Sequence, residues 1–572
     1  MTTFARRLQA LRARTPDRIA VYLQHAGRDD VPISYARLAS AATAYARSFA
    51  RAGVKPGEVA VLILQHGEDL IYAFWGAVLH GAIPSIMPFL TEKLAPERYR
   101  ADLASLISVT RPAALVTYPE FEAEVRSALK AGDSVRALIV TDDLESETAA
   151  ALESFSGFQR QPEHVVLLQH SSGTTGLQKG VALSHAAVFN QLTAYGAALG
   201  LNESDVVVSW LPLYHDMGLM AGFLMPILAG VSLVLSSPFD WVRAPYRLLQ
   251  SVSRYQGTLT WLPNFAFNFC AQRIRERDLE GVDLSSWRAV INCSEPVRHA
   301  SHQAFASKFR AFGLRDAALQ TCYAMAENVF AVTQSDLARP PAVEQIDRDA
   351  FMQSRAARPP GPGAATIAML SSGRPLANVR LRVLDDEGRE VQDGGIGEIA
   401  VQSDCMLTGY YNRPDETEKA LRDGWYLTGD YGYRSKGELF VAGRKKDMII
   451  VGGRNVYPQD LEALTDEVPG VHAGRSVAFG LYDEDQGTED VVIIAEVDSE
   501  LQAEHGRIAD AIRQHVTRNS AIALRHVKVV GPKWIVKTSS GKTARPANKE
   551  KFLKELEVAA AVDKGAPAES AG

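Results

Sequence analysis

Short runs of β-branched and aliphatic residues alternate with helix-length segments over roughly the first half of this chain. Neighbouring parallel strands need a crossover of a dozen or more residues, usually a helix, so the alternation favours parallel sheets covered by helices. A helix-length segment at 70–79 follows the first such run and fits this pattern. We therefore predict an α/β fold. The predicted strands are 59–64, 113–117, 137–141, 206–209, 231–235, 259–262 and 289–292.

The pattern changes near residue 380, where short strands separated by turn residues replace the alternation. Hairpin-like runs fill about 380–440 and predict a β-rich subdomain. A β-run followed by a helical pattern then returns, which predicts a small α+β C-terminal domain at 446–557. The large N-terminal domain, with its helix-covered sheets, would span 1–445. The tail at 558–572 is rich in Ala, Gly, Ser and Pro and is predicted to be disordered.

The composition excludes several classes of protein. With 61 Lys and Arg against 67 Asp and Glu, and no basic cluster interleaved with aromatic residues, the chain has no nucleic-acid footprint. Its four cysteines lie far apart and the start lacks an apolar signal core, which favours a reducing, cytoplasmic location. Residues 217–239 carry no charge, but Pro226 and Gly230 interrupt them. We therefore predict a buried helix and a buried strand there, and no integral membrane segment.

A loop rich in glycine and hydroxyl residues follows the apolar run 165–168. Gly173 and Gly176 carry no Cβ, so the backbone can turn its N–H groups toward an anion. Lys179 adds a mobile positive charge for a polyphosphate. The spacing differs from that of the P-loop, in which a lysine directly follows the second glycine, and taken alone the loop is equally compatible with a surface turn. Its hydroxyl donors are Ser171, Ser172, Thr174 and Thr175.

Five further motifs stand in a fixed order along the chain. They are Trp-Leu-Pro-Leu-Tyr-His-Asp-Met-Gly at 210–218, Tyr-Ala-Met-Ala-Glu at 323–327, Tyr-Leu-Thr-Gly-Asp at 426–430, Gly-Arg-Lys-Lys-Asp at 443–447 and Lys-Thr-Ser-Ser-Gly-Lys at 537–542. In order and spacing they resemble the adenylate-forming enzymes, the superfamily of acyl-CoA synthetases, luciferases and peptide-synthetase adenylation domains. The resemblance runs from about residue 11 to about residue 554. Residues 210–218, 263–266 and 295–298 are similar to the fatty acyl-AMP ligases in particular.

This resemblance implies a site that joins a carboxylate to the α-phosphate of ATP and expels pyrophosphate. Lys542 would be the catalytic cation between the two anions, and His215 would lie near the carboxylate. Glu327, together with Thr174, would bind Mg²⁺, and Lys446 would be the hinge of a mobile C-terminal domain. The implied ATP-binding residues are Ser171, Ser172, Gly173, Thr174, Thr175, Gly176, Lys179, Ser294, Glu295, Pro296, Tyr323, Ala324, Met325, Asp430 and Arg444.

Within that set the resemblance also implies separate roles. The ring of Tyr323 would lie against the adenine, and the segment 294–296 would form a wall beside it. Asp430 would accept hydrogen bonds from both ribose hydroxyls, while Arg444 would approach the ribose from the domain junction. The loop with Lys179 would hold the β- and γ-phosphates.

Residues 338–365 are similar to the insertion of the fatty acyl-AMP ligases, which pass the acyl group to an acyl carrier protein rather than to coenzyme A. The leading prediction is therefore activation of a fatty acid as acyl-AMP, followed by transfer to the phosphopantetheine thiol of an acyl carrier protein. A fatty acyl-CoA ligase is the alternative. A catalytically silent AMP-binding module is the third interpretation, which the presence of Lys179, Glu327, Asp430 and Lys542 disfavours.

The chain departs from the family pattern at three places near the predicted site. Ala324 stands where the family usually has glycine, and the pair Cys293 and Ser294 stands where the family has the smaller Gly-Ala. Asn328 after Glu327 is also unusual. These departures bear on the identity of the acyl substrate more than on the reaction.

Overall fold

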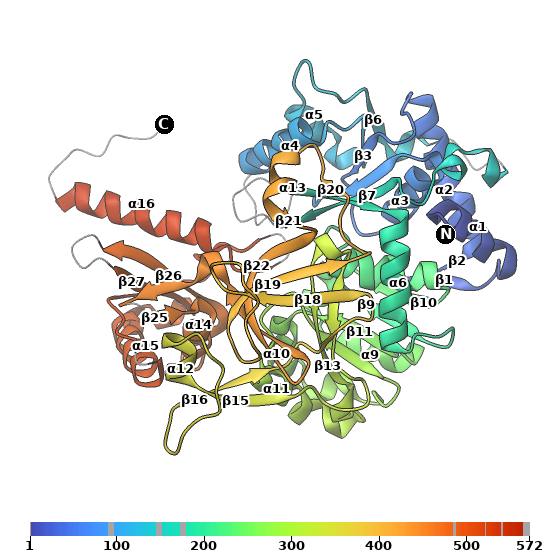
Figure 1. The fold of residues 1–572 in the computed structure, drawn as a ribbon. Helices are drawn as coiled ribbons and strands as arrows, with labels where there is room; N and C mark the ends of the chain where they lie inside the picture. The colour runs from blue at the N-terminus through green and yellow to red at the C-terminus, as the bar shows by residue number, and fades with distance from the viewer. Residues whose placement is uncertain are drawn as a thin grey trace.

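The computed structural model describes residues 2–89, 96–144, 151–171, 179–452, 454–483, 488–520, 522–538 and 541–563. Two helix-covered sheets form a large domain, a β-rich subdomain lies beside them, and a smaller C-terminal domain lies at one end of the molecule (left in Figure 1). The predicted α/β class, with a large N-terminal and a smaller C-terminal domain, is confirmed.

The first sheet has nine strands in the order β17-β14-β13-β12-β11-β9-β10-β1-β2. From β13 through β1 all neighbours are parallel. Nearly every residue of β11, β12 and β13 is buried, as a sheet covered on both faces requires. The strands are β1 (Ile19–Gln24), β2 (Val31–Ser34), β9 (Val206–Ser209), β10 (Ser232–Ser236), β11 (Leu259–Leu262), β12 (Ala289–Asn292), β13 (Leu319–Ala324), β14 (Ala331–Gln334) and β17 (Arg374–Pro375).

The second sheet has seven strands in the order β20-β8-β7-β4-β3-β5-β6. Each strand predicted from the alternation lies in one of the two sheets, and the predicted helical segment 70–79 lies in α3. The strands are β3 (Val59–Leu62), β4 (Ile83–Ile86), β5 (Ala114–Thr117), β6 (Ala137–Val140), β7 (Val165–Ser171), β8 (Lys179–Ser184) and β20 (Gly409–Tyr410). The helices of the large domain include α1 (Phe4–Arg14), α2 (Tyr35–Arg51), α3 (Glu68–His80), α4 (Pro96–Thr110), α5 (Glu122–Ala128), α6 (His185–Leu199), α8 (Pro238–Arg243), α9 (Tyr246–Tyr255), α10 (Asn264–Arg273) and α11 (His299–Phe309).

The uncharged stretch 217–239 folds as the sequence predicts, into a buried helix followed by a strand. A π-helical segment η5 (Met217–Leu224) continues into α7 (Met225–Ala229), which ends at Gly230 in the left-handed conformation before β10. Across the part of the chain that the structure describes, no helix combines the length and the apolar character needed to cross a membrane.

The β-rich subdomain is an antiparallel sheet of β18 (Val379–Leu384), β19 (Gly397–Ser403), β21 (Leu421–Arg422), β22 (Trp425–Ser435) and β23 (Glu438–Arg444). Within 338–365 the structure has β15 (Val343–Asp347) and α12 (Arg348–Gln353), and β15 pairs with β16 (Thr366–Leu370). The Asp347 side chain caps α12 by accepting a hydrogen bond from Ala350 N at 2.8 Å. This segment therefore has a defined hairpin-and-helix structure.

One hydrophobic cluster joins this segment to the β-rich subdomain and to the C-terminal domain. We call it the junction cluster. Because all three regions share it, their relative arrangement is stabilised by buried apolar contacts. The cluster includes Ile346, Phe351, Met352, Tyr433, Phe440, Ile449, Tyr457 and Leu461.

The C-terminal domain packs helices against a three-stranded sheet in the order β26-β27-β28. The chain from 558 is predicted to be disordered, but α16 continues to Asp563, because the alanine-rich residues there have high helix propensity. Residues 564–572 lie outside the described part. The elements are β24 (Ile449–Val451), β25 (Arg454–Val456), α14 (Pro458–Asp466), β26 (Val471–Asp483), β27 (Thr488–Val497), α15 (His505–Ser520), β28 (His526–Val530) and α16 (Arg545–Asp563).

Candidate active site

Four neighbouring strands of the nine-stranded sheet bring several of the predicted segments to one edge. β9, β11, β12 and β13 run parallel, so their carboxyl ends lie on the same side. In parallel α/β sheets, ligands bind in the crevice outside these ends. The segments that leave the four strands begin at Trp210, Pro263, Cys293 and Met325. The fold thus gathers segments that are far apart in the sequence.

Asp430 is the centre of a polar cluster made by strands. Tyr323 Oη donates a hydrogen bond to Asp430 Oδ2 at 2.7 Å, and Arg444 Nε lies 3.5 Å from Asp430 Oδ1. Asp430 and Arg444 face each other across β22 and β23, so the sheet sets their spacing. Burial, and then the charge of Asp430, raises the pKa of the Tyr323 hydroxyl, which keeps it a donor. The carboxylate has lone pairs left for further donors, such as two hydroxyl groups.

Glu327 forms a second polar group with Tyr410 and Tyr426. Tyr410 Oη donates to Glu327 Oε1 at 2.8 Å and lies 3.0 Å from Tyr426 Oη. Burial raises the pKa of Glu327; the Tyr410 bond opposes this shift, and the nearby charge of Asp216 adds to it. A cation beside Glu327 would therefore be favoured. The two tyrosines were not predicted as site residues.

Lys542 of the C-terminal domain is hydrogen-bonded to Thr538 through its backbone. Thr538 N donates to Lys542 O at 2.7 Å, and Lys542 N donates to Thr538 Oγ1 at 3.1 Å. Gly541 has a φ of +85°, which glycine adopts without strain. A Cβ at Gly541 would lie 3.9 Å from the ring of Phe265. Gly541, directly before Lys542, therefore lies against the segment that leaves β11 in the large domain.

Two carboxylates of the large domain act on the Lys542 ammonium group. Burial lowers the pKa of Lys542, whereas the charge of Asp216 raises it; Arg444 lowers it and Glu295 raises it. Asp216 and Glu295 thus favour the protonated lysine in a site where burial disfavours it. The lysine predicted to be catalytic lies in the same crevice as the 210–218 motif.

His215 and Asp216 form a close pair at the start of η5. His215 Nδ1 lies 2.6 Å from Asp216 Oδ1, and the same carboxylate accepts a hydrogen bond from Met217 N at 2.8 Å, which caps the segment. Burial alone would raise the pKa of Asp216, but His215, Lys542 and the Met217 bond bring it down to about 2. Asp216 was not predicted as a site residue, although the motif that contains it was the available signal.

The segment after β12 lies between η5 and α10. Cys293 Sγ is 3.1 Å from Met217 Sδ, and Glu295 Oε2 accepts a hydrogen bond from Phe265 N at 2.9 Å. Ser294 has a φ of +67°, which is uncommon for a residue with a side chain. The structure thus places Ser294 and Glu295 at the crevice, with Pro296 next in the same loop.

The predicted phosphate loop is described only at its two ends. Ser171 is the last residue of β7 and Lys179 is the first of β8. Lys179 Nζ lies 2.5 Å from Glu416 Oε2 and 4.8 Å from the centre of the Tyr410 ring, whose hydroxyl binds Glu327. Lys179 is therefore near the Glu327 group. The predicted residues Ser172, Gly173, Thr174, Thr175 and Gly176 lie outside the described residues.

Lys446 lies in a short 3₁₀ turn, Lys445–Asp447, directly after β23. Burial, followed by the charge of Arg444, lowers the pKa of Lys446 to about 8. Arg545 Nη1 binds Asp447 Oδ2 at 2.8 Å, which ties this turn to α16. The predicted hinge thus stands at the boundary between the subdomain and the C-terminal domain.

A turn directly after Glu327 forms one wall of an apolar pocket. Ala324 ends β13, and Met325 N then donates to Phe330 O at 2.8 Å. Phe330 N donates to Asn328 O at 2.6 Å, and Val329 has a φ of +62° and a ψ of −56°. This is a γ-turn, which is strained for a β-branched residue. Asn328 stabilises it, because its Nδ2 donates to Ala331 O at 2.7 Å.

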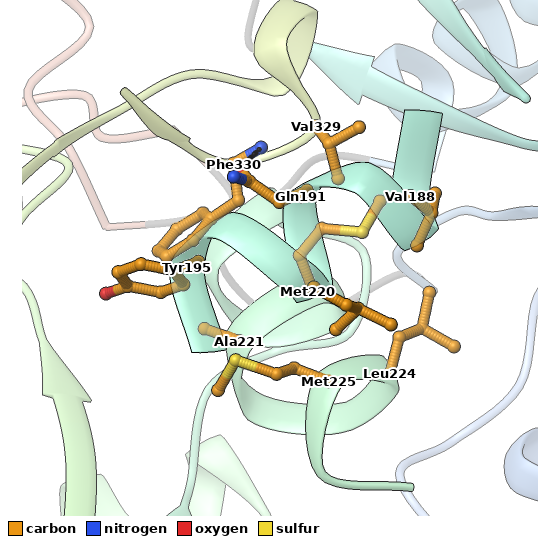
Figure 2. Close-up of a pocket in the computed structure, with 10 residues that line it drawn as sticks. Val188, Gln191, Tyr195, Met220, Ala221, Leu224, Met225, Val329 and Phe330 are labelled. Carbon is orange, nitrogen blue, oxygen red and sulfur yellow. Dashed lines mark hydrogen bonds between the residues drawn. The ribbon is translucent and has the colours of Figure 1, made fainter. Parts of the chain in front are cut away.

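This small pocket lies between α6, the helical segment η5–α7 and the γ-turn, as Figure 2 shows. Its walls carry mainly aliphatic, methionine and aromatic side chains. Pockets of this character bind apolar ligands.

Residues 8–411 match the protein-family model described as AMP-binding enzyme. A putative acyl-CoA synthetase of Caulobacter vibrioides is 31% identical over 540 residues, which cover 91% of this chain and 90% of the relative. The medium-chain-fatty-acid–[acyl-carrier-protein] ligase JamA of Moorena producens is 28% identical and covers 93% and 92% of the two chains. A solved structure from a study of fatty acyl-adenylate ligases of E. coli and L. pneumophila has a TM-score of 0.89 at 26% identity, covering 98% of both chains.

Proposed function

Because this chain belongs to the family of AMP-binding enzymes, adenylate-forming ligases that use ATP, we propose that it activates a fatty acid as acyl-AMP and then passes the acyl group to the phosphopantetheine thiol of an acyl carrier protein. The observation that carries the first step is the position of Lys542, in one crevice with Asp216 and Glu295 and within the electrostatic influence of Arg444. The name of the JamA relative supports the fatty acid and the carrier protein.

In the first step a carboxylate oxygen attacks the α-phosphorus of ATP, and the bond to the β-phosphate breaks to release pyrophosphate. Both reactants are anions, so the site must supply positive charge where negative charge develops. Lys542 would donate to the carboxylate and to the α-phosphate. Asp216 and Glu295 favour its protonated form. The pocket beside the γ-turn would hold the acyl chain.

The strand-borne groups would bind the nucleotide before the chemistry. Asp430 would accept the ribose hydroxyls while it keeps its bond from Tyr323. Lys179 would exchange its ion pair with Glu416 for the phosphates. Both contacts form equally well before and during the reaction, so they would act mainly on ATP affinity.

Glu327 is the residue in the described part that fits a magnesium ion. Mg²⁺ is usually bound by one or two carboxylates together with phosphate oxygens, and the described residues contain no cluster of three or more His, Cys, Asp or Glu ligands. The raised pKa of Glu327 indicates a carboxylate that would gain from a cation. Mg²⁺ would supply charge neutralisation at the phosphates, with Thr174 as the second predicted ligand.

The proposed acceptor rests on the packing of residues 338–365 against the C-terminal domain. The ring centres of Phe351 and Tyr457 are 5.5 Å apart, Arg348 Nη1 donates to Asn519 O, and Asn455 Nδ2 donates to Met352 O at 3.5 Å. Thiol transfer would require the C-terminal domain to turn about Lys446. Residues 338–365 share the junction cluster with the β-rich subdomain and the C-terminal domain, so they should lower the population of molecules in which the C-terminal domain has turned. The apparent rate of acyl transfer to free coenzyme A should fall with that population. A carrier protein adds its own contacts and can recover that population.

The acceptor is tested by offering coenzyme A and an acyl carrier protein in parallel after ATP and a fatty acid. We expect the wild type to acylate the carrier and to make little acyl-CoA, and Phe351→Ala to raise acyl-CoA formation. Val343→Ala is the matched control, because Val343 lies in the same segment but is 38% exposed. Strong acyl-CoA formation by the wild type, unchanged in Phe351→Ala, would favour an acyl-CoA ligase, the activity in the name of the Caulobacter relative.

A further inference from the structure

The apolar pocket contains one polar group that the proposed function leaves unused. Gln191 lies on α6, lines the pocket and is 3% exposed (Figure 2). Its Oε1 accepts a hydrogen bond from Phe330 N at 3.1 Å. Its Nε2 has no hydrogen-bond partner among the residues that the structure describes.

The contact with Phe330 fixes the orientation of the Gln191 amide. A backbone N–H only donates, so the side-chain atom that receives it must be the carbonyl oxygen. The reverse orientation would set two donors against each other. The other end of the amide is therefore an NH₂ group, which can only donate.

The second polar side chain of the pocket wall is fully paired. Tyr195 Oη donates to Gln334 Oε1 at 3.0 Å and accepts from Trp261 Nε1 at 2.8 Å. Most buried polar groups are paired in this way, and the exceptions need an explanation. The rest of the lining includes the apolar side chains of Val188, Met220, Leu224, Met225 and Val329.

We propose that Gln191 Nε2 donates a hydrogen bond to an oxygen on the acyl chain, and that the enzyme selects acids whose chain carries a hydroxyl, keto or ether oxygen inside the pocket. This inference rests on the proposed function, because it takes the pocket as the acyl site. The pocket is next to the predicted reaction centre: η5 begins directly after Asp216, and Val329 stands two residues after Glu327.

A hydrogen-bond donor in an apolar pocket wall discriminates between substrates more strongly than the apolar side chains around it. One methylene changes the preference of an apolar pocket only modestly, whereas a site built to bind a substrate oxygen rejects the analogue that leaves its polar group unpaired. An unsubstituted chain would leave Gln191 Nε2 without a partner. An oxygenated chain of the same length would satisfy it.

The first test uses the wild-type protein and pyrophosphate release. The probes are decanoic acid and the monohydroxydecanoic acids, with the hydroxyl moved stepwise along the chain. We expect one isomer to exceed decanoic acid in kcat/KM by roughly tenfold, the effect of one hydrogen bond to a buried donor. Equal values across the series, or decanoic acid ahead of every isomer, would overturn the inference. No pyrophosphate release with any acid would instead overturn the proposed function.

The second test assigns the selectivity to Gln191. In Gln191→Met the preference for the best isomer over decanoic acid is expected to fall to about one, because the donor is lost. The bond to Phe330 N is lost as well, so all rates are expected to drop, and the measured quantity is the ratio. Met225→Leu, a volume-conserving change in the same wall, should keep the ratio. A ratio unchanged in Gln191→Met would contradict the assignment.

Discussion

The predicted nucleotide side of the site and the proposed acyl pocket lie next to each other but are built differently. On the nucleotide side, polar groups on strands and strand ends bind one another, as Tyr323 binds Asp430 and Tyr410 binds Glu327. The pocket is walled by helices and by one strained turn, and Gln191 Nε2 in its wall has no hydrogen-bond partner among the described residues. The pairing of β22 with β23 sets the spacing between Asp430 and Arg444. The site would thus combine polar groups of fixed spacing for the nucleotide with an apolar wall for the acid.

The largest expected effect comes from Lys542. This residue belongs neither to the nucleotide side nor to the acyl pocket, because it reaches the site from the C-terminal domain. Lys542→Ala should slow pyrophosphate release on the order of 10² to 10³-fold and leave ATP binding largely intact, since one well-placed charge donor is lost. The loss should be the same for every acid. Lys537→Ala is the control, because Lys537 Nζ instead donates to Gly474 O at 2.8 Å. Near-normal pyrophosphate release by Lys542→Ala would remove the lysine from the reaction.

The next effect separates nucleotide binding from acid binding. Asp430→Ala should raise the KM for ATP roughly 10- to 100-fold, because charge-assisted hydrogen bonds to the ribose are lost. The KM for the fatty acid should change little. Steady-state kinetics with each substrate varied in turn would measure both values. An unchanged KM for ATP with a collapsed kcat would give Asp430 a different role.

Asp216 stands where the two sides meet, and its charge is expected to stabilise the fold in a pH-dependent way. Its pKa of about 2 lies below the usual 3.8, so the carboxylate contributes about 2 kcal/mol at neutral pH. This contribution is complete above about pH 4 and is lost as the pH falls toward 2. Asp216→Asn should therefore lower the urea midpoint of unfolding at pH 6, and the difference should shrink at pH 3. A difference independent of pH would contradict the assignment.

The smallest effect should be confined to the pocket. Ala221→Val adds two methyl groups to the wall and should exclude one or two methylenes of a long acid. At about 0.8 kcal/mol for each buried methylene, kcat/KM for the longest accepted acid should fall roughly tenfold. Shorter acids and the KM for ATP should be affected less. An equal loss of kcat/KM for all chain lengths would show that the pocket does not limit the length of the acyl chain.

The sequence predicted most of what depends on local patterns. The run 59–64 contains β3, and the uncharged stretch 217–239 contains η5, α7 and β10, because burial of aliphatic runs and breaks at Pro and Gly are local signals. The motif at 426–430 likewise contains Asp430, and the motif at 443–447 contains Arg444, which pairs with Asp430 across β22 and β23.

Contacts between distant segments could not be predicted in this way. Asp216 acts on Lys542 across the domain junction, and Tyr410 binds Glu327 through the pairing of β20 with β8. Gln191 lies in an ordinary helical pattern, and the orientation of its amide becomes visible only when the γ-turn at Val329 is placed beside it. The roles of Lys542 and Asp430 stay predictions that the variants above can test, and the hinge role of Lys446 stays a prediction as well.

The junction cluster also gives the arrangement of the domains a dependence on temperature. Turning the C-terminal domain about Lys446 would separate Phe351 from Tyr457 and expose apolar surface to water. Exposure of apolar surface raises the heat capacity, and apolar contacts weaken on cooling. The turned arrangement should therefore become more populated in the cold. Relative to adenylation, thiol transfer is expected to be favoured as the temperature falls.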